Sequence, residues 1–263
     1  MGALEAVTPS ASRLLAPNPG PMTLDGTNTW VLRAPGGAGS AVVIDPGPLE
    51  NGHLDDIAAL HRDGTCLIAA IVLTHGHFDH GECAPQLHEL TGAPVIARDP
   101  KLCIASEPIS DRPGRSALAG LEWLTVLTPG HSSDSVSFVL ESDRALLTGD
   151  TVLGRGTAVI AHPDGNLGDY LDSLQRLRDI AAGDIEVILP GHGPVLHQPI
   201  EVLDHYLTHR AARLEQVRAA IAAGDTDEDA VVRRVYADVD ESLWPHALLS
   251  VRAQLDYLRD SDG

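Results

Sequence analysis

The chain has 263 residues, of which 43% are apolar; this can bury the core of one large domain, or of a domain with a small appendage, and excludes wholesale disorder. Its 37 acidic residues outnumber its 18 basic ones, and the formal net charge of −19 disfavours double-stranded DNA and anionic membranes as partners. The three cysteines form no disulfide pattern, no apolar run approaches the ~20 residues of a membrane span, and residues 1–20 lack the features of a signal peptide, so we expect a cytoplasmic protein.

Two strands and a helix are predicted near the N-terminus. Residues 18–21 are typical of a turn, whereas residues 27–32 and 41–44 have the composition of strands. An Asp-Pro-Gly turn at residues 45–47 ends the second strand, and this turn is explained equally well by plain turn chemistry or by a role in a site. Residues 54–60 then show the apolar spacing of a helix.

A dense group of potential metal ligands follows a third predicted strand at residues 68–73. Within six positions the chain places three imidazoles and one carboxylate: His75, His77, Asp79 and His80. Imidazole nitrogen and carboxylate oxygen are ligands that Zn²⁺ prefers. A glycine at position 76 breaks the chain where a central strand would end, so these side chains can turn toward a common region.

Three later segments repeat the arrangement of an apolar strand, a glycine turn and one ligand-type residue. The strands are predicted at residues 124–127, 144–148 and 186–189, and the ligand-type residues that follow them are His131, Asp150 and His192. In sheets interleaved with helices, functional groups collect at the strand ends of one edge. The sequence therefore predicts that seven ligand-type residues meet at one place.

At these positions the chain resembles the metallo-β-lactamase fold superfamily, whose signature is His-x-His-x-Asp-His followed by separate His, Asp and His ligands. All seven positions match. The resemblance implies an α/β fold, a four-layer αββα sandwich, with two Zn²⁺ ions per chain. It assigns one ion to His75, His77 and His131 and the other to Asp79, His80 and His192, with Asp150 bridging both.

The resemblance also implies a reaction type. A hydroxide held between two Zn²⁺ ions forms near neutral pH and can attack a carbonyl or phosphoryl centre. Asp79, which could also accept or relay a proton, and the bridging Asp150 are therefore the expected catalytic residues. One common class of zinc β-lactamases carries cysteine where Asp150 stands, whereas the cysteines of this chain are at positions 66, 83 and 103, which argues against β-lactam hydrolysis.

Two further segments bear on the substrate. Residues 101–120 show little periodicity and are predicted to be a long loop. Residues 154–157, Gly-Arg-Gly-Thr, are too short for a phosphate-binding loop, but they resemble a loop of a narrower subgroup, the β-lactamase-like protein 2 endoribonucleases, as residues 19–32 resemble its opening. Arg155 and Thr157 are therefore candidate substrate-binding residues, with a tight structural turn as the alternative.

The C-terminal region is predicted to be helical, and we expect a hydrolase domain at residues 1–199 and an appendage at residues 200–263. A long helix over 200–223 has a stripe of Leu203, Leu207, Leu214, Val217 and Ile221, and two shorter helices follow, as in the winged-helix-like appendage of the same subgroup. His205 and His209 have a metal-binding spacing but no carboxylate, so we interpret them as a polar helix face. The acidic tail leaves little of a basic wing, which favours a lid or a homodimer contact.

Together these features predict a dinuclear zinc hydrolase that attacks an ester-type bond of a small ester or thioester. Three alternatives stay open: an endoribonuclease for single-stranded RNA, a glyoxalase II-like thioester hydrolase and a non-catalytic metal-binding scaffold. RNA would need a local cationic patch, for which the sequence offers Arg155, Arg210, Arg213, Arg233 and Arg234. The intact set of seven ligand-type residues argues against the scaffold.

Overall fold

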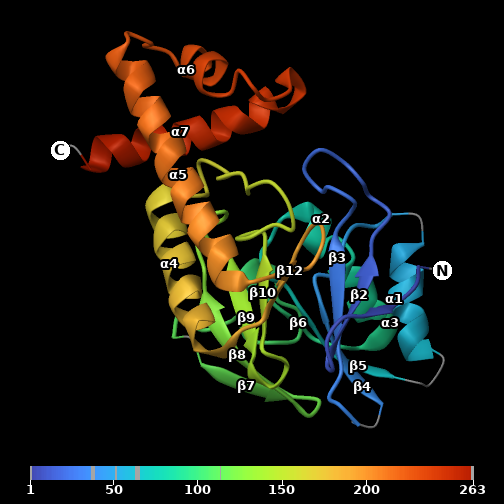
Figure 1. The fold of residues 1–263 in the computed structure, drawn as a ribbon. Helices are drawn as coiled ribbons and strands as arrows, with labels where there is room; N and C mark the ends of the chain where they lie inside the picture. The colour runs from blue at the N-terminus through green and yellow to red at the C-terminus, as the bar shows by residue number, and fades with distance from the viewer. Residues whose placement is uncertain (1, 37–38, 51, 63–65, 113, 262–263) are drawn as a thin grey trace.

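The computed structural model describes residues 2–36, 39–50, 52–62, 66–112 and 114–261, which form two facing sheets with helices outside them (Figure 1). The first sheet has six strands in chain order: β1 (Glu5–Ala6), β2 (Ala11–Leu15), β3 (Asn28–Leu32), β4 (Ser40–Ile44), β5 (Leu67–Val72) and β6 (Val95–Ile96). Strands β1 to β4 pair antiparallel, whereas β4, β5 and β6 run parallel. The carboxyl ends of β4 and β5 therefore lie at the same edge.

The second sheet also has six strands, in the spatial order β12-β11-β10-β9-β8-β7. Its strands are β7 (Arg115–Leu118), β8 (Leu121–Leu127), β9 (Val136–Leu140), β10 (Ala145–Gly149), β11 (Val187–Pro190) and β12 (Leu196–His197), with the short helix η2 (Glu141–Asp143) between β9 and β10. Only the β10–β11 pair is parallel among the pairs described in this sheet. The loops that follow β10 and β11 therefore lie at the same edge of the sheet.

Helices cover the outer face of each sheet (Figure 1). On the first sheet, α1 (His53–Arg62) and α3 (Ala84–Thr91) bury Ile57 and Leu87 in a cluster with Ile71 of β5. On the second sheet, α4 (Leu167–Asp184) and α5 (Pro199–Ala222) bury Leu174 and Leu203 in a separate cluster. These amphipathic helices are therefore stabilised mainly by their packing on the sheets.

The inner faces of the two sheets enclose a further core. Trp30, Phe138 and Leu147 belong to one buried cluster between the sheets, and each such side chain contributes roughly 1.5–3 kcal/mol by its removal from water. Nε1 of Trp30 also donates to the carbonyl of Pro190, at 3.1 Å, and so joins one sheet to the other. The predicted four-layer αββα sandwich is confirmed.

The region predicted to be a long loop, residues 101–120, is partly regular, so the prediction is wrong for its second half. After the short helix η1 (Pro100–Leu102), strand β7 forms a hairpin with β8 through a two-residue turn in which Ala119 and Gly120 have φ of 56° and 77°. Strand β7 is an edge strand with mostly exposed side chains. It therefore lacks the apolar alternation by which a strand is predicted.

The C-terminal region is helical and stands beside the sandwich (Figure 1). It contains α6 (Glu228–Val235), η3 (Glu241–Leu243) and α7 (Trp244–Ser261), and the C-terminal half of α5 packs Val217 against Val232 and Val251. The N-terminal half of α5 instead packs Leu203 beneath the second sheet, so the helix serves both cores. The boundary between residues 199 and 200 stays a prediction.

Among the helices that the structure describes, none has the length and apolar character of a membrane span.

Candidate metal centre and adjoining pocket

The candidate metal centre lies where the two sheets meet, at the carboxyl ends of their parallel strands. Strand β5 leads into the first ligand-type residues, α2 (Phe78–Gly81) carries the next two, and the loops after β8, β10 and β11 supply the others. All seven predicted residues come together in three overlapping groups with ligand atoms within 4.8 Å of one another: His75–His77–His131, His75–His80–Asp150 and Asp79–His80–His192. A β-bridge between Thr27 and His192 joins the two sheets directly at this edge.

In the first group three imidazole nitrogens converge. Nδ1 of His77 lies 3.0 Å from Nε2 of His75 and 2.9 Å from Nε2 of His131. Nδ1 of His131 donates to the Val159 carbonyl at 2.6 Å, and Nδ1 of His75 bonds Oγ1 of Thr74 at 3.0 Å. With protons on these outer nitrogens, the inner nitrogens of both rings present lone pairs. A tetrahedral Zn²⁺ with bonds of about 2.0–2.1 Å separates its ligand atoms by about 3.3 Å, which is close to the spacing found here.

The second group repeats this pattern with a carboxylate. Nε2 of His192 lies 3.0 Å from Oδ2 of Asp79 and 3.2 Å from Nε2 of His80. The outer nitrogen of His80 donates to Asp45 at 2.8 Å, and that of His192 donates to the carbonyl of Gly26 at 3.2 Å. Such outer hydrogen bonds fix the ring orientation and tautomer of metal-ligating histidines. Both groups therefore offer the ligand atoms that a divalent cation needs.

Asp150 lies between the two groups. Its Oδ1 is 3.4 Å from Nε2 of His80, and its Oδ2 is 3.3 Å from Nε2 of His192 and 3.9 Å from Nε2 of His131. Oδ1 is buried and has no hydrogen-bond partner among the described residues. A buried carboxylate oxygen in this condition is costly unless a cation or a donor completes it. The position therefore suits a carboxylate that bridges two cations.

The titration of the imidazoles differs between the two groups. Burial lowers the pKa of His75 well below its ordinary value and that of His131 to about 4, so both rings are neutral at pH 7. Burial acts in the same direction on His192, but the nearby carboxylates, first of all Asp150, raise its pKa to about 9. The same carboxylates outweigh burial at His80 and hold its pKa well above the ordinary value. Without a bound cation, His80 and His192 therefore keep their protons at pH 7, because the surrounding carboxylates stabilise positive charge there.

Two glycines allow the strand ends to approach so closely. A Cβ atom at Gly191 would crowd the carboxylate of Asp150 and would lie 2.7 Å from Cε1 of His80. At Gly149, where φ is +48°, a Cβ would lie 2.5 Å from Oγ1 of Thr74. Neither contact is sterically acceptable. The glycine turns noted in the sequence are thus required by the packing of the site itself.

Asp45 is a part of the site that the sequence left undecided. Its carboxylate is 1% exposed and accepts hydrogen bonds from the backbone N and the Oγ1 of Thr74, at 2.8 and 2.7 Å, as well as from His80. Oγ1 of Thr74 in turn accepts from His75. One carboxylate thus orients a ring of each group. The signal that could have revealed it is its place directly after strand β4, where an acidic residue ends an apolar strand as Asp150 does.

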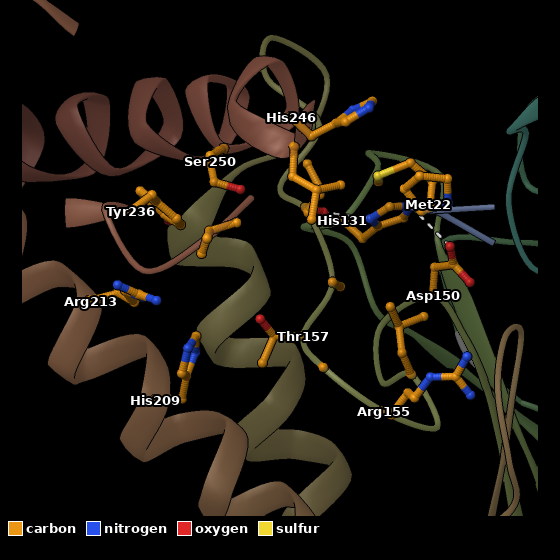
Figure 2. Close-up of a pocket in the computed structure, with 18 of the residues that line it drawn as sticks. Met22, His131, Asp150, Arg155, Thr157, His209, Arg213, Tyr236, His246 and Ser250 are labelled. Carbon is orange, nitrogen blue, oxygen red and sulfur yellow. Dashed lines mark hydrogen bonds and ion pairs between the residues drawn. The ribbon is translucent and has the colours of Figure 1, made fainter. Parts of the chain in front are cut away.

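A cavity of about 350 Å³ opens beside the metal centre, between the loop around residues 153–159 and helices α5 and α7 (Figure 2). Arg155 and Thr157 both line it, together with His131 and Asp150 at its metal end. Arg155 makes a two-bond ion pair with Asp25, at 2.6 and 2.9 Å, across the loops. The two candidate substrate-binding residues are therefore placed beside the metal centre, but the charge of Arg155 is already compensated.

Helix α5 differs in detail from its predicted apolar stripe. Ile221 is 44% exposed, and the buried positions include Tyr206 and Arg210 instead. His205 and His209 belong to none of the possible metal groups in the described part of the chain, and His209 lines the cavity; their interpretation as a polar helix face stays a prediction. A charged residue on the buried side of a helix, such as Arg210, is a sequence signal that could have pointed to this pocket.

The comparisons with known proteins agree with this geometry. Residues 22–192 match the Metallo-beta-lactamase superfamily, and residues 228–262 match the Beta-lactamase associated winged helix domain. The chain is 31% identical to a Beta-lactamase-like protein 2 homolog of Caenorhabditis elegans, over 97% of this chain and 86% of the relative. It is 32% identical to an Aspergillus fumigatus protein named atrochrysone carboxyl ACP thioesterase, over 83% of this chain and 67% of that protein.

A solved structure of the same fold is that of a metallo-beta-lactamase family protein from Thermus thermophilus. It superposes with a TM-score of 0.79 at 22% identity and covers 98% of this chain and 95% of its own. The superfamily consists generally of metal-dependent hydrolases, and the His and Asp residues of its signature lie together here as a candidate metal site. The chain is therefore a hydrolase of the metallo-β-lactamase superfamily that carries the associated winged-helix domain.

Proposed function

We propose that the protein is a dinuclear zinc hydrolase that cleaves an ester-type bond of a small acyl substrate. The observation that carries the proposal is Asp150, whose buried Oδ1 accepts no hydrogen bond from the described residues and which lies between two groups of converging imidazoles. A carboxylate in this position can hold two cations at once. The residues that would hold one zinc are His75, His77 and His131, and those that would hold the other are Asp79, His80 and His192.

The chain's own carboxylates then have separate roles. Two bound zinc ions supply a Lewis acid for the acyl oxygen and a water of strongly lowered pKa. The side chain of Asp79 is 30% exposed, whereas that of Asp150 is 11% exposed, so Asp79 is the more accessible to a water or a leaving group. With metal bound, Asp79 would be placed to accept or relay a proton of a water at the site, and Asp150 would offset the charge of both cations. Asp45 keeps the rings of His75 and His80 in place.

The adjoining pocket supports a small acyl substrate over RNA. A volume of about 350 Å³ corresponds to one small-molecule site, and Met22, Leu153 and Val159 give it apolar walls. Arg155 and Thr157 line it and are the proposed substrate contacts. The protein named thioesterase among its relatives supports the inclusion of thioesters.

The arginines that RNA binding would need are mostly paired with carboxylates. Arg155 pairs with Asp25 and Arg234 with Asp225, whereas Arg213 and Arg233 lie 3.7 and 3.8 Å from the exposed carboxylates of Asp238 and Asp227, and Arg210 is buried in the pocket wall. Together with the net charge of −19, this arrangement disfavours a polyanion, which needs an extended cationic surface, more than a small anion inside the pocket. The cytoplasmic location and the homodimer contact stay predictions.

A substrate panel on zinc-loaded protein tests the proposal. The panel contains acylated thiols, lactones, a chromogenic β-lactam and single-stranded RNA, each assayed with and without a chelator. We expect turnover of acyl substrates that is lost with the chelator and restored by zinc, and that is about 100-fold or more lower in the Asp150→Ala protein. If RNA were the one substrate cleaved, and its cleavage rate fell steeply as salt rises, the endoribonuclease proposal would replace the acyl-hydrolase proposal.

A further inference from the structure

The pocket beside the metal centre has opposite polarity at its two ends. Asp150, at the metal end, is the one carboxylate among the described residues that line it. The far end, against α5 and α7, is lined by Arg210, Arg213, His209 and His246. Figure 2 shows His209 and Arg213 across the pocket from Asp150. The chain as a whole has a net charge of −19, but this end of the pocket is lined by basic side chains and by no carboxylate of the described residues.

Arg210 is the residue at this end whose bonding is incomplete. It is 3% exposed, its guanidinium lies 4.9 Å from the centre of the Tyr170 ring, and one of its nitrogens donates to the carbonyl of Ala158. Its Nε is buried and has no hydrogen-bond partner among the described residues, and no ion pair of the described chain involves it. A buried guanidinium without a counter-charge is costly, and an anion bound beside it would remove that cost.

Its neighbours are also available to an anion. Nδ1 of His209 is buried without a partner in the described structure, and burial lowers the pKa of His209 to about 4, so the ring is a neutral donor or acceptor at pH 7. Arg213 lies over the Tyr236 ring, 4.7 Å from its centre, and its carboxylate neighbour Asp238 is 3.7 Å away and 76% exposed. The pair is weak at that distance, so Asp238 offsets little of the charge of Arg213, although Nη1 of Arg213 already donates to the carbonyl of Val235 and to Oε1 of Gln216.

We infer that the α5 end of the pocket is an anion subsite that binds a carboxylate or phosphate of the substrate at a distance from the scissile bond. The inference rests on the proposed function, because it places the scissile bond at His131 and Asp150. The planar guanidinium groups of Arg210 and Arg213 match the geometry of either anion. Apolar walls between the two ends select a substrate whose reacting carbonyl and anionic group are separated by an apolar segment.

Two matched pairs of thioesters test this selectivity and identify the source of the anion. The first pair is glutaryl-N-acetylcysteamine and its methyl ester, which differ only in the charge of the acyl end. The second pair is butyryl-pantetheine and butyryl-phosphopantetheine, which differ only in the phosphate on the thiol side. We expect kcat/KM to be about tenfold or more higher for the charged member of one pair, as for a hydrogen-bonded charge. No preference in either pair overturns the subsite.

Three variants connect the preference to the pocket. In Arg213→Gln and Arg210→Lys proteins the preference should fall close to one while the zinc content stays unchanged. Arg234→Gln is the matched control, because Arg234 belongs to the same helical region but pairs with Asp225 and does not line the pocket. An unchanged preference in both Arg213→Gln and Arg210→Lys, with thermal melting showing them folded, would contradict the assignment.

A binding measurement separates this inference from the proposed function. Calorimetric titration of the zinc-loaded protein with 5-(ethylthio)pentanoate and with its methyl ester requires no turnover. If the acid binds in an Arg213-dependent way although no thioester is hydrolysed, the subsite stands and the acyl-hydrolase proposal fails. If thioesters are hydrolysed but acid and ester bind alike and the phosphate pair also shows no preference, the subsite fails and the hydrolase stands. RNA cleavage that depends on Arg213, without binding of the acid, would also overturn the subsite.

Discussion

The carboxylate of Asp45 lies 2.8 Å from Nδ1 of His80, and both side chains are excluded from solvent. The same carboxylate accepts two hydrogen bonds from Thr74, whose hydroxyl accepts one from His75. Asp45 thus contacts one ring of each candidate metal group, directly or through one hydroxyl, without being a ligand itself. Partners of this kind orient metal-binding histidines and raise their basicity.

Replacement of Asp45 by Asn should weaken metal binding although all seven proposed ligands remain. An amide has a single acceptor oxygen and cannot satisfy the three donors that Asp45 serves, so the ring of His80 loses its orientation. We expect zinc affinity to fall about 10- to 100-fold, as measured by competition with a chromogenic chelator. Asp25→Asn is the control, since Asp25 is an exposed carboxylate that pairs with Arg155. Equal affinities in the wild type and Asp45→Asn would contradict the role.

Two zinc ions should bind per chain, and Asp150 should be needed for that number. Seven ligand-type residues exceed the four positions of one tetrahedral ion. Elemental analysis after zinc loading and desalting should give a ratio near two for the wild type and for His205→Ala, and a lower ratio for Asp150→Ala. Turnover in Asp150→Ala should fall about 100-fold or more. A ratio near one in the wild type would reject the dinuclear site.

Zinc binding should release protons mainly from the second group. The pKa of His192 in the metal-free protein is raised to about 9, so the ring carries a proton at pH 7 that zinc must displace. Carboxylates also hold the pKa of His80 well above its ordinary value, so the affinity of that site should rise by at least about tenfold per pH unit from pH 7 toward 9. Burial holds the pKa of His75 and His131 low, so these rings release no proton over that range.

Calorimetry in buffers of different ionisation enthalpy measures the protons released by each zinc. The prediction fails if both sites bind zinc with the same pH dependence. It also fails if neither site releases a proton at pH 7.

Gly191→Ala should disrupt the metal centre with no change in any ligand. The added Cβ would crowd Asp150 and lie 2.7 Å from His80, so the bridging carboxylate must move. We expect reduced zinc content and turnover in a protein that still folds, as shown by circular dichroism. Gly183→Ala is the matched control, because nothing lies within 4 Å of a Cβ there and the position is within helix α4. Alanine should stabilise that helix by roughly 0.5–1 kcal/mol. Full zinc content in Gly191→Ala would refute the steric argument.

Much of the candidate site could be predicted because its signals are local. The His-x-His-x-Asp-His stretch and the strand–glycine–ligand segments that end at His131, Asp150 and His192 are each contained in a few neighbouring residues. Strand ends at one edge of a sheet lie close together, so the convergence of His131, Asp150 and His192 follows from the pattern, whereas the packing of the two sheets brings the His-x-His-x-Asp-His residues to them. The resemblance carried by the same residues implied the layered fold.

Edge and surface elements were less predictable because their side chains carry no apolar pattern. Strand β7 is exposed along most of its length, and only its pairing with β8 makes it a strand. The buried face of α5 likewise depends on what packs against it, so that Arg210 is buried while Ile221 is exposed.

The sequence by itself thus determined the ligand-type residues and the class of hydrolase, since both depend on residue types at short spacing. The tertiary structure alone decided which groups support and neighbour them. Asp45 meets His80 across 35 positions, Arg155 meets Asp25 across 130, and α5 and α7 bring their donors to a pocket whose other end is Asp150. Contacts between residues so far apart in the chain arise only when the sheets and helices pack, because no local pattern specifies which distant side chain will face another.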